Sequence, residues 1–272
     1  MTRSQRTREI AIVETKGTAG SVVKSAARVL EVLGVFDDFR REMRVGEISD
    51  ILGFPQSSTS VLLRSLVKLG YLDFDPRTRA FSVTARVAFL GSWVADGAIV
   101  NGTVVQAMQD LSRETGHTIT LAARNGIFAQ YIHVIQATNA LRLHTPVGTR
   151  RLLVWSASGF ALLRDLPEPE IAALVRRTNA EQPRQKLNSK DVINNVKAFR
   201  EEEYFFSKEL VTPGGGHIAM RLPSRSAGRE HTLALGVSGW IEEIMRGEAR
   251  ILKLMRRALR DIELGTRKDF AS

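Results

Sequence analysis

Short hydrogen-bonding side chains follow one another without a break from Gln56 to Ser60. An apolar stripe with helical spacing comes next, at Leu62, Leu63, Leu66 and Leu69. Hydroxyl and amide groups at the start of a helix can hydrogen-bond base edges and phosphate oxygens in a DNA major groove. The leucines would bury the other face of that helix. The pattern therefore predicts a helix that packs on one side and binds nucleic acid on the other.

A shorter amphipathic segment lies just before this helix, with apolar residues at Val45, Ile48, Ile51 and Leu52. A Gly-Phe-Pro turn at residues 53–55 separates the two segments. Two helices joined by a tight, glycine-containing turn are typical of a helix-turn-helix, in which the first helix supports the second. We therefore expect the second helix to enter the major groove.

Arg64 lies on the predicted reading face, because positions 57, 60, 61, 64 and 68 share one side of the helix opposite the leucines. A guanidinium can hold a guanine edge through two hydrogen bonds or clamp a phosphate. Ser57 has the alternative role of N-cap, and both roles are compatible because helix N-termini bind phosphates. The residues predicted to contact DNA are Arg44, Gln56, Ser57, Ser58, Ser60, Arg64, Lys68, Arg77 and Arg79.

A β-hairpin is predicted behind the helix pair, with strands at residues 71–74 and 80–83. Its Asp-Pro turn carries Arg77 and Arg79, which suit contact with a phosphate backbone or a minor groove. An ordinary solvated hairpin is the alternative interpretation. The charged segment 37–44 also has two interpretations, since its arginines either reach phosphates or belong to a solvated loop.

The length of the chain allows two domains, and its composition is that of an ordinary soluble protein. A chain of 272 residues can build two separate cores. The absence of cysteine excludes disulfides and thiolate metal sites. No apolar run approaches the roughly 18 residues of a membrane span, and the polar, basic N-terminus does not resemble a signal peptide. We therefore expect a cytoplasmic location without membrane contact.

The net charge of +10 favours an anionic partner. Residues 1–100 hold 14 Lys and Arg against 11 Asp and Glu, so 14 − 11 = +3, and the remainder holds 25 − 18 = +7. Because the excess is not concentrated around the helix-turn-helix, the charge supports nucleic-acid binding only weakly. The motif carries that prediction.

Periodicity and turn residues divide the chain into four parts. Residues 1–20 are polar and predict a disordered arm. A helix through Phe36 with Ser21 as N-cap opens the winged helix-turn-helix domain, residues 21–84. Residues 85–111 are apolar on more than one helical face, which predicts a buried linker helix within a dimer interface. Residues 112–272 form the last domain.

This last domain alternates strands and helices, which predicts an α/β (α+β) fold. Asn125-Gly126 predicts a tight hairpin. In the final helix, five apolar residues from Ile244 to Ile262 share one inward face. The predicted strands are 118–123, 127–134, 141–147, 217–222 and 232–237, and the predicted helices are 156–166, 189–202 with Ser189 as N-cap, and 242–264.

In the order of these parts the chain resembles the IclR family of bacterial transcriptional regulators, over about residues 21–262. The resemblance implies a winged helix-turn-helix, a linker helix and a C-terminal GAF-like α/β effector domain. The chain departs from the family pattern at Val61, where an arginine is usual, and at Leu152, Val154 and Phe160. The matching positions are Gly53, Pro55, Ser57, Ser58, Leu62, Leu63, Leu66, Gly70–Leu72, Val147–Leu163 in outline, Ile218-Ala219 and Gly236–Gly239.

The resemblance also implies a cavity for a small organic or aromatic acid. The helix start at Ser156–Gly159 would offer free backbone N–H groups to a carboxylate. His217 follows three glycines, which let a ligand approach the backbone. For His217 the alternative is a histidine at the end of a strand without a functional role. For the cavity the alternative is a vestigial pocket that binds no ligand. The residues predicted to bind the ligand are Leu143, Thr145, Ser156, Ala157, Ser158, Gly159, Ser207, His217 and Ser238.

Catalytic motifs are missing from the sequence. The five histidines have no metal-ligand spacing, Ser156–Gly159 is no Gly-x-Ser-x-Gly elbow, and residues 214–216 lack the Lys-Ser/Thr of a phosphate loop. We therefore expect a regulator that is not an enzyme and needs no cofactor. It would act as a homodimer or dimer of dimers on a pseudo-palindromic operator in double-stranded DNA. The alternative is a small-molecule sensor or enzyme with an incidental helix-turn-helix.

Overall fold

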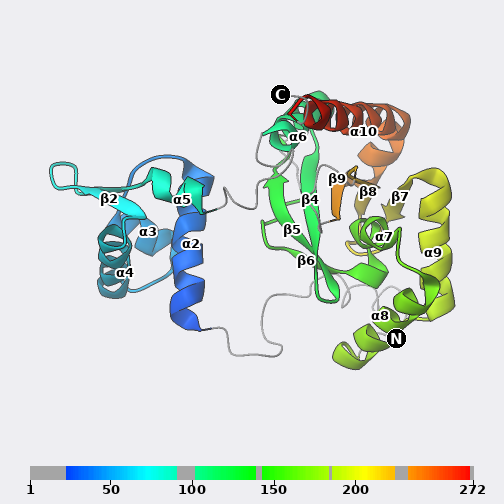
Figure 1. The fold of residues 1–272 in the computed structure, drawn as a ribbon, viewed down its shortest axis with the longest axis horizontal. Helices are drawn as coiled ribbons and strands as arrows, with labels where there is room; N and C mark the ends of the chain where they lie inside the picture. Colours follow the sequence, from blue (N-terminus) through cyan, green and yellow to red (C-terminus); the bar gives the residue numbers. More distant parts are fainter. Residues whose placement is uncertain (1–22, 91–101, 139–142, 184–185, 224–231, 270–272) are drawn as a thin grey trace. The chain divides into compact units, whose positions relative to one another are not determined.

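A computed structural model of the chain describes residues 23–90, 102–138, 143–183, 186–223 and 232–269 (Figure 1). The described residues fall into two compact units, residues 23–90 and residues 102–269. The predicted arm, residues 1–20, and the predicted N-cap Ser21 lie outside the described residues.

The N-terminal unit is a winged helix-turn-helix. Helices α3 and α4 form the predicted pair, and β2 and β3 form the predicted hairpin, so both predictions are confirmed. Strand β1 completes an antiparallel sheet in the order β1-β3-β2. The core includes Phe36, Met43, Ile48, Leu63 and Leu66. The elements are α2 (Lys24–Phe39), β1 (Met43–Arg44), α3 (Val45–Leu52), α4 (Gln56–Lys68), β2 (Leu72–Asp75), β3 (Ala80–Val83) and α5 (Ala85–Phe89).

Three details of this unit differ from the sequence predictions. Helix α2 begins after Val23 and continues to Phe39, which shortens the expected charged loop. The N-cap of α4 is Pro55, so Ser57 belongs to the first turn and its predicted capping role is wrong. Leu69 is the C-cap of α4 and is 58% exposed, so it does not belong to the buried stripe that the sequence predicted.

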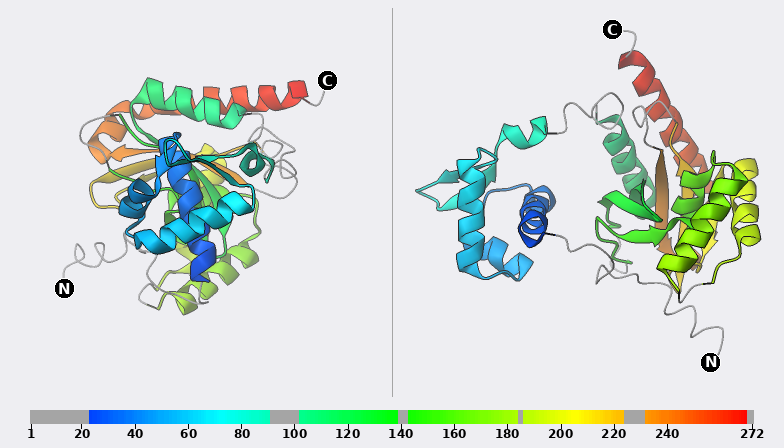
Figure 2. Two further views of the ribbon diagram at one scale, coloured as in Figure 1. Left: turned by 90° about the vertical axis from the view of Figure 1, so that its left-hand side faces the viewer. Right: turned by 60° about the horizontal axis from the view of Figure 1, so that its bottom comes forward.

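The C-terminal unit is built on a six-stranded antiparallel sheet in the order β6-β5-β4-β9-β8-β7. Figure 2 shows α6 and α10 side by side on one face of this sheet. The elements are α6 (Thr103–Thr115), β4 (Thr118–Asn125), β5 (Phe128–Ile135), β6 (Arg150–Leu152), a 3-10 turn (Leu153–Trp155), α7 (Ala157–Leu163), α8 (Glu168–Glu181), α9 (Ser189–Glu202), β7 (Tyr204–Lys208), β8 (Gly215–Arg221), β9 (Leu233–Trp240) and α10 (Ile241–Asp269).

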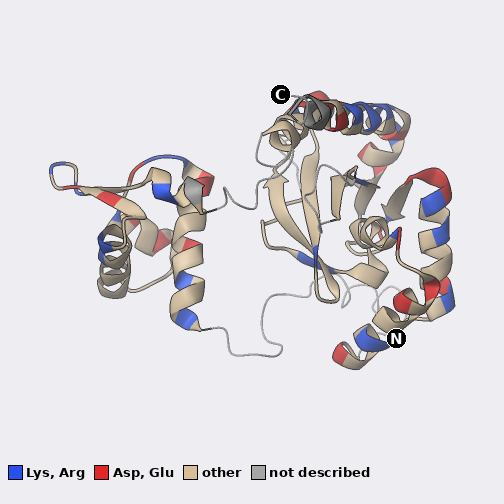
Figure 3. Cartoon of the chain, in the orientation of Figure 1, with Lys and Arg blue, Asp and Glu red and all other residues tan. Residues whose placement is uncertain are grey.

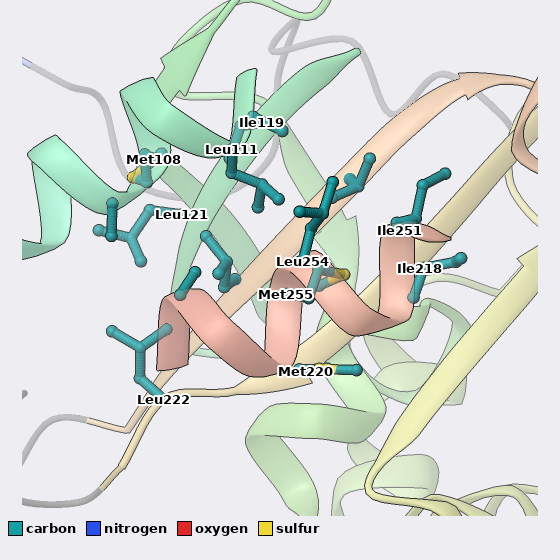
Figure 4. Packing of buried hydrophobic residues seen from close by; sticks show 14 of the residues in the cluster. Met108, Leu111, Ile119, Leu121, Ile218, Met220, Leu222, Ile251, Leu254 and Met255 are labelled. Atoms are coloured by element: carbon teal, nitrogen blue, oxygen red, sulfur yellow. The ribbon is translucent and has the colours of Figure 1, made fainter. Parts of the chain in front are cut away.

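Two apolar cores lie on the two faces of this sheet. The first core joins α6 and α10 to residues of β4, β8 and β9 such as Leu121, Ile218 and Leu235 (Figure 4). The second joins α7, α8 and α9 to the opposite face. The predicted inward face of the last helix is confirmed, because its five apolar residues are buried: Ile244, Ile251, Met255, Ala258 and Ile262.

Several predictions for this unit are wrong. The third strand is β6, not residues 141–147: those described, 143–147, form no strand and lead into a turn at Gly148, with φ of 83°. Asn188, not Ser189, caps α9, because its side chain accepts a hydrogen bond from the Lys190 N–H. The predicted linker helix, 85–111, is not one element: α5 ends at Phe89, and α6 belongs to the first core of the C-terminal unit.

Gly159 in α7 packs directly against the backbone that precedes the helix. A Cβ atom at this position would lie 2.0 Å from the carbonyl oxygen of Leu153 and 2.5 Å from its carbonyl carbon. Backbone cannot yield as the end of a flexible side chain can. We expect Gly159→Ala to lower the free energy of unfolding by roughly 3 kcal/mol, measured by urea denaturation.

Gly247→Ala in α10 is the matched control, because its new Cβ would meet nothing closer than Ile251 Cδ1 at 3.4 Å. The free energy of unfolding of this control should rise by up to about 1 kcal/mol, because alanine has a higher helix propensity than glycine. Wild-type stability in the Gly159→Ala variant would contradict the prediction.

Candidate functional site

The outer face of α4 presents polar and charged side chains to solvent. Leu63 and Leu66 bury the inner face, while Ser57, Arg64 and Lys68 are exposed. Gln56, at the helix start, is exposed as well. Basic residues also mark the tip of the β2–β3 hairpin (Figure 3). The helix therefore offers the hydrogen-bonding surface that the sequence predicted for this face.

A groove of about 930 Å³ lies between α3, α4 and the hairpin. Arg44 from the start of α3, Arg64 from α4 and Arg79 from the hairpin all line it. Three arginines from three elements thus line one hollow, together with Gln56 and Ser60. Such a surface can hold phosphate oxygens and base edges.

Hydrogen bonds fix the shape of this groove. Arg44 donates from Nε to the Thr78 carbonyl at 3.0 Å, and its backbone N–H donates to Glu47 Oε2 at 2.8 Å. The hydrogen bond from Arg41 lowers the pKa of the Glu47 carboxyl, and the backbone of Arg44 lowers it further. Arg44 therefore links the start of α3 to the hairpin turn.

The other predicted DNA contacts are distributed around this groove. Ser58 Oγ donates a hydrogen bond to the Pro55 carbonyl at 2.9 Å, so the proton of this hydroxyl is already used at the start of the helix. Arg77 lies in the hairpin turn with its side chain 93% exposed, and its backbone N–H donates to Asp75 Oδ1 at 2.8 Å. Four of the nine predicted DNA-binding residues do not line the groove: Ser57, Ser58, Lys68 and Arg77.

A second hollow, a cavity of about 530 Å³, lies in the C-terminal unit. It has seven of the nine predicted ligand residues in its wall: Leu143, Thr145, Ser156, Ala157, Ser207, His217 and Ser238. Gly215 and Gly216, two of the three glycines that were expected to let a ligand approach, line it as well. Sequence reasoning missed the remaining lining residues: Tyr131, His144, Arg151, Val211, Thr212 and Pro213. Arg151 reaches the wall through strand pairing, because its partner Ala129 lies on the same face of β5 as Tyr131.

Ser158 and Gly159 do not line the cavity. Both are buried in α7, and Gly159 packs on Leu153. The Gly159 N–H donates to Ser156 Oγ at 3.1 Å, so it is not free for a carboxylate as the sequence analysis expected. The N-cap serine thus satisfies one N–H of the helix start.

Arg151, Tyr131 and His217 bring three different polar groups to the cavity. Tyr131 Oη lies 3.3 Å from His217 Nδ1. Burial, with a smaller contribution from the nearby Arg151 guanidinium, lowers the pKa of His217 to about 4. Burial also raises the pKa of the Tyr131 phenol. At neutral pH the cavity therefore combines a cationic guanidinium with an uncharged imidazole and phenol, a set that can bind a small anion.

Gly236 on β9 makes room for the His217 ring. A Cβ at this glycine would lie 2.1 Å from His217 Nε2 and 2.5 Å from Thr120 Oγ1. The imidazole therefore lies across the glycine, between β8 and β4. Any larger residue at position 236 would displace it.

The described residues contain no cluster of three His, Asp or Glu side chains suited to a metal ion. Among those same residues, none of the helices is both long enough and apolar enough to cross a membrane.

A winged helix-turn-helix unit followed by an α/β unit with a polar cavity is typical of ligand-responsive DNA-binding proteins. The model of the IclR helix-turn-helix domain matches residues 25–76, and that of the bacterial transcriptional regulator IclR C-terminal domain matches residues 98–264. The chain belongs to the IclR family.

Curated relatives of the chain are named as transcriptional regulators. The HTH-type transcriptional regulator KipR of Bacillus subtilis is 28% identical over 155 residues, which are 57% of this chain and 61% of KipR. The match thus spans less than two thirds of that relative. The HTH-type transcriptional repressor AllR of Escherichia coli is 26% identical over 209 residues, 75% of this chain and 77% of AllR.

Solved structures share the fold. The effector domain of a putative IclR regulator from Acinetobacter has a TM-score of 0.56 at 26% identity and covers 60% of this chain and 95% of its own. An IclR homologue from Microbacterium hydrocarbonoxydans, complexed with 4-hydroxybenzoate, has a TM-score of 0.59 at 15% identity, over 90% of this chain and 99% of its own.

The low pKa of His217 predicts a pH-dependent stability. The folded-state pKa of about 4 lies below the ordinary value of 6.5, so the unfolded chain binds more protons between these values. The stability that neutral His217 contributes is fully present above about pH 6.5. It is lost as the pH falls from this value through about 4. We expect His217→Gln to remove up to about 3 kcal/mol of this dependence, measured by urea unfolding from pH 4 to 7. Identical pH slopes in the two proteins would refute the assignment.

Proposed function

We propose that this protein is a transcriptional regulator that binds double-stranded operator DNA through α4 and the hairpin. The observation that carries the proposal is the groove that Arg44, Arg64 and Arg79 line from three elements beside the exposed polar face of α4. Arginine supplies both phosphate contacts and bidentate guanine contacts. The match of residues 25–76 to the IclR helix-turn-helix domain supports it.

The proposed signal is a small organic or aromatic acid held in the C-terminal cavity. Arg151 would bind the carboxylate, while Tyr131, His217, Ser207 and Ser238 would hydrogen-bond the rest of the ligand. The Microbacterium homologue complexed with 4-hydroxybenzoate supports this class of ligand. To change DNA affinity, the acid must bind one conformation of the protein more tightly than another.

The proposed assembly is a homodimer or a dimer of dimers in the cytoplasm. Two copies related by a two-fold axis would read two half-sites, so the operator would be a pseudo-palindrome.

Fluorescence anisotropy tests the DNA-binding proposal with the full chain. We expect the protein to bind DNA from upstream of its own gene, or a site selected from a random library, at least roughly 10³-fold more tightly than scrambled DNA at the same physiological salt. Equal, steeply salt-dependent binding to both DNAs would mean that charge without sequence readout accounts for the interaction, and would overturn the proposal.

Arg64→Ala tests base readout within that operator. We expect it to cost roughly 1–3 kcal/mol and to relax the sequence preference at one operator position. Lys24→Ala, an exposed basic residue of α2, is the control and should leave that preference intact. Unchanged affinity and preference in the Arg64 variant would exclude base contact by this residue.

Arg151→Gln tests the effector site. We expect the variant to bind the operator as tightly as the wild type, but to need at least roughly tenfold more acid for the same change in DNA affinity, since a charged hydrogen bond contributes about 1.5–3 kcal/mol. Arg176→Gln, an exposed arginine outside the cavity, is the control. A screen of benzoate-type and short aliphatic acids would supply the ligand. An unaltered response to the acid in the Arg151 variant would mean that another group binds the carboxylate.

A further inference from the structure

Val61 places a large apolar side chain on the polar face of α4. The residue is 66% exposed. It lies one turn after Ser57 and one turn before Arg64, so all three share the outward face of the helix. The neighbours on this face are hydroxyl and guanidinium groups, whereas Val61 can form no hydrogen bond through its side chain.

The fold does not require this valine. Its side chain is absent from the apolar core, which Leu63 and Leu66 fill from the other side of the helix. Its carbonyl accepts a hydrogen bond from Ser65 Oγ at 2.8 Å, a role of the backbone that any residue could fill. Valine is also less favourable than alanine inside a helix, because its branched Cβ restricts the rotamer. The exposed side chain of Val61 is therefore available to contact a partner.

The chemistry of the major groove indicates which group on DNA an exposed valine would fit. Base edges in the major groove carry hydrogen-bond donors and acceptors. The one apolar group among them is the 5-methyl group of thymine. A valine pressed against a polar edge would remove water without replacing its hydrogen bonds. Against a methyl group it would instead bury apolar surface.

We infer that Val61 contacts the 5-methyl group of a thymine and so specifies thymine at one operator position. The inference rests on the proposed function, since it requires α4 in the major groove. Val61 and Arg64 differ by three residues, a rise of about 4.5 Å along the helix. Base pairs are about 3.4 Å apart. The thymine should thus lie within about two base pairs of the base that Arg64 reads.

Deoxyuridine tests the inference, because it differs from thymidine in lacking the 5-methyl group. Each thymine of the selected operator is replaced by deoxyuridine in turn, and binding of the full chain is measured by anisotropy. We expect one position, or one in each half-site, where the replacement weakens binding roughly fourfold, the effect of one buried methyl group. Val61→Ala should bind the thymine operator roughly fourfold more weakly and be indifferent to deoxyuridine there.

Val23→Ala is the matched control, because Val23 is also 66% exposed but precedes α2. It should retain the full wild-type sensitivity to deoxyuridine. An operator whose thymines can all be replaced without effect would overturn the inference, and so would a Val61→Ala variant as sensitive as the wild type. Either result would leave the proposed function standing. A protein that selects no DNA sequence at all would instead overturn the proposed function and this inference with it.

Discussion

The alternation of large and small side chains along β9 shapes the C-terminal unit. Successive residues of a strand point to opposite faces of the sheet. One face of β9 carries large residues that pack under α6 and α10, and the other carries small ones. One strand therefore closes an apolar core and also leaves space for the cavity. The large residues are Leu233, Leu235 and Val237, and the small ones are Ala234, Gly236 and Ser238.

The space above Gly236 also determines the chemistry of the cavity. The His217 ring occupies it, and burial there keeps the imidazole uncharged at neutral pH. His217 can then exchange a hydrogen bond with Tyr131 without adding a second positive charge beside Arg151. In the proposed effector site the two residues would therefore have separate roles: the guanidinium would attract an anion, and the uncharged imidazole would hydrogen-bond a neutral group of the ligand.

Local patterns were enough to predict the helix-turn-helix, the hairpin and most strands, because each depends on periodicity and on turn residues such as Asn125-Gly126. The cavity was harder. Seven predicted residues line it, but Arg151 was missed because its role depends on which face of β6 it occupies, and that depends on pairing with β5. Ser158 and Gly159 were wrongly assigned to the cavity wall because the sequence does not reveal that α7 packs against Leu153. Long-range packing, rather than local propensity, decided these cases.

In the N-terminal unit, Arg44 belongs both to the hydrogen bonds of the fold and to the groove proposed to bind DNA. Its backbone N–H satisfies Glu47, and its Nε holds the Thr78 carbonyl in the hairpin turn. A guanidinium has five N–H groups, so one can fix the hairpin while others face a ligand. Because the net charge is spread over both units, general attraction to DNA cannot by itself orient the protein. Orientation must come from the few side chains whose relative positions are fixed, and the hydrogen bond between Arg44 and Thr78 fixes the hairpin against the start of α3.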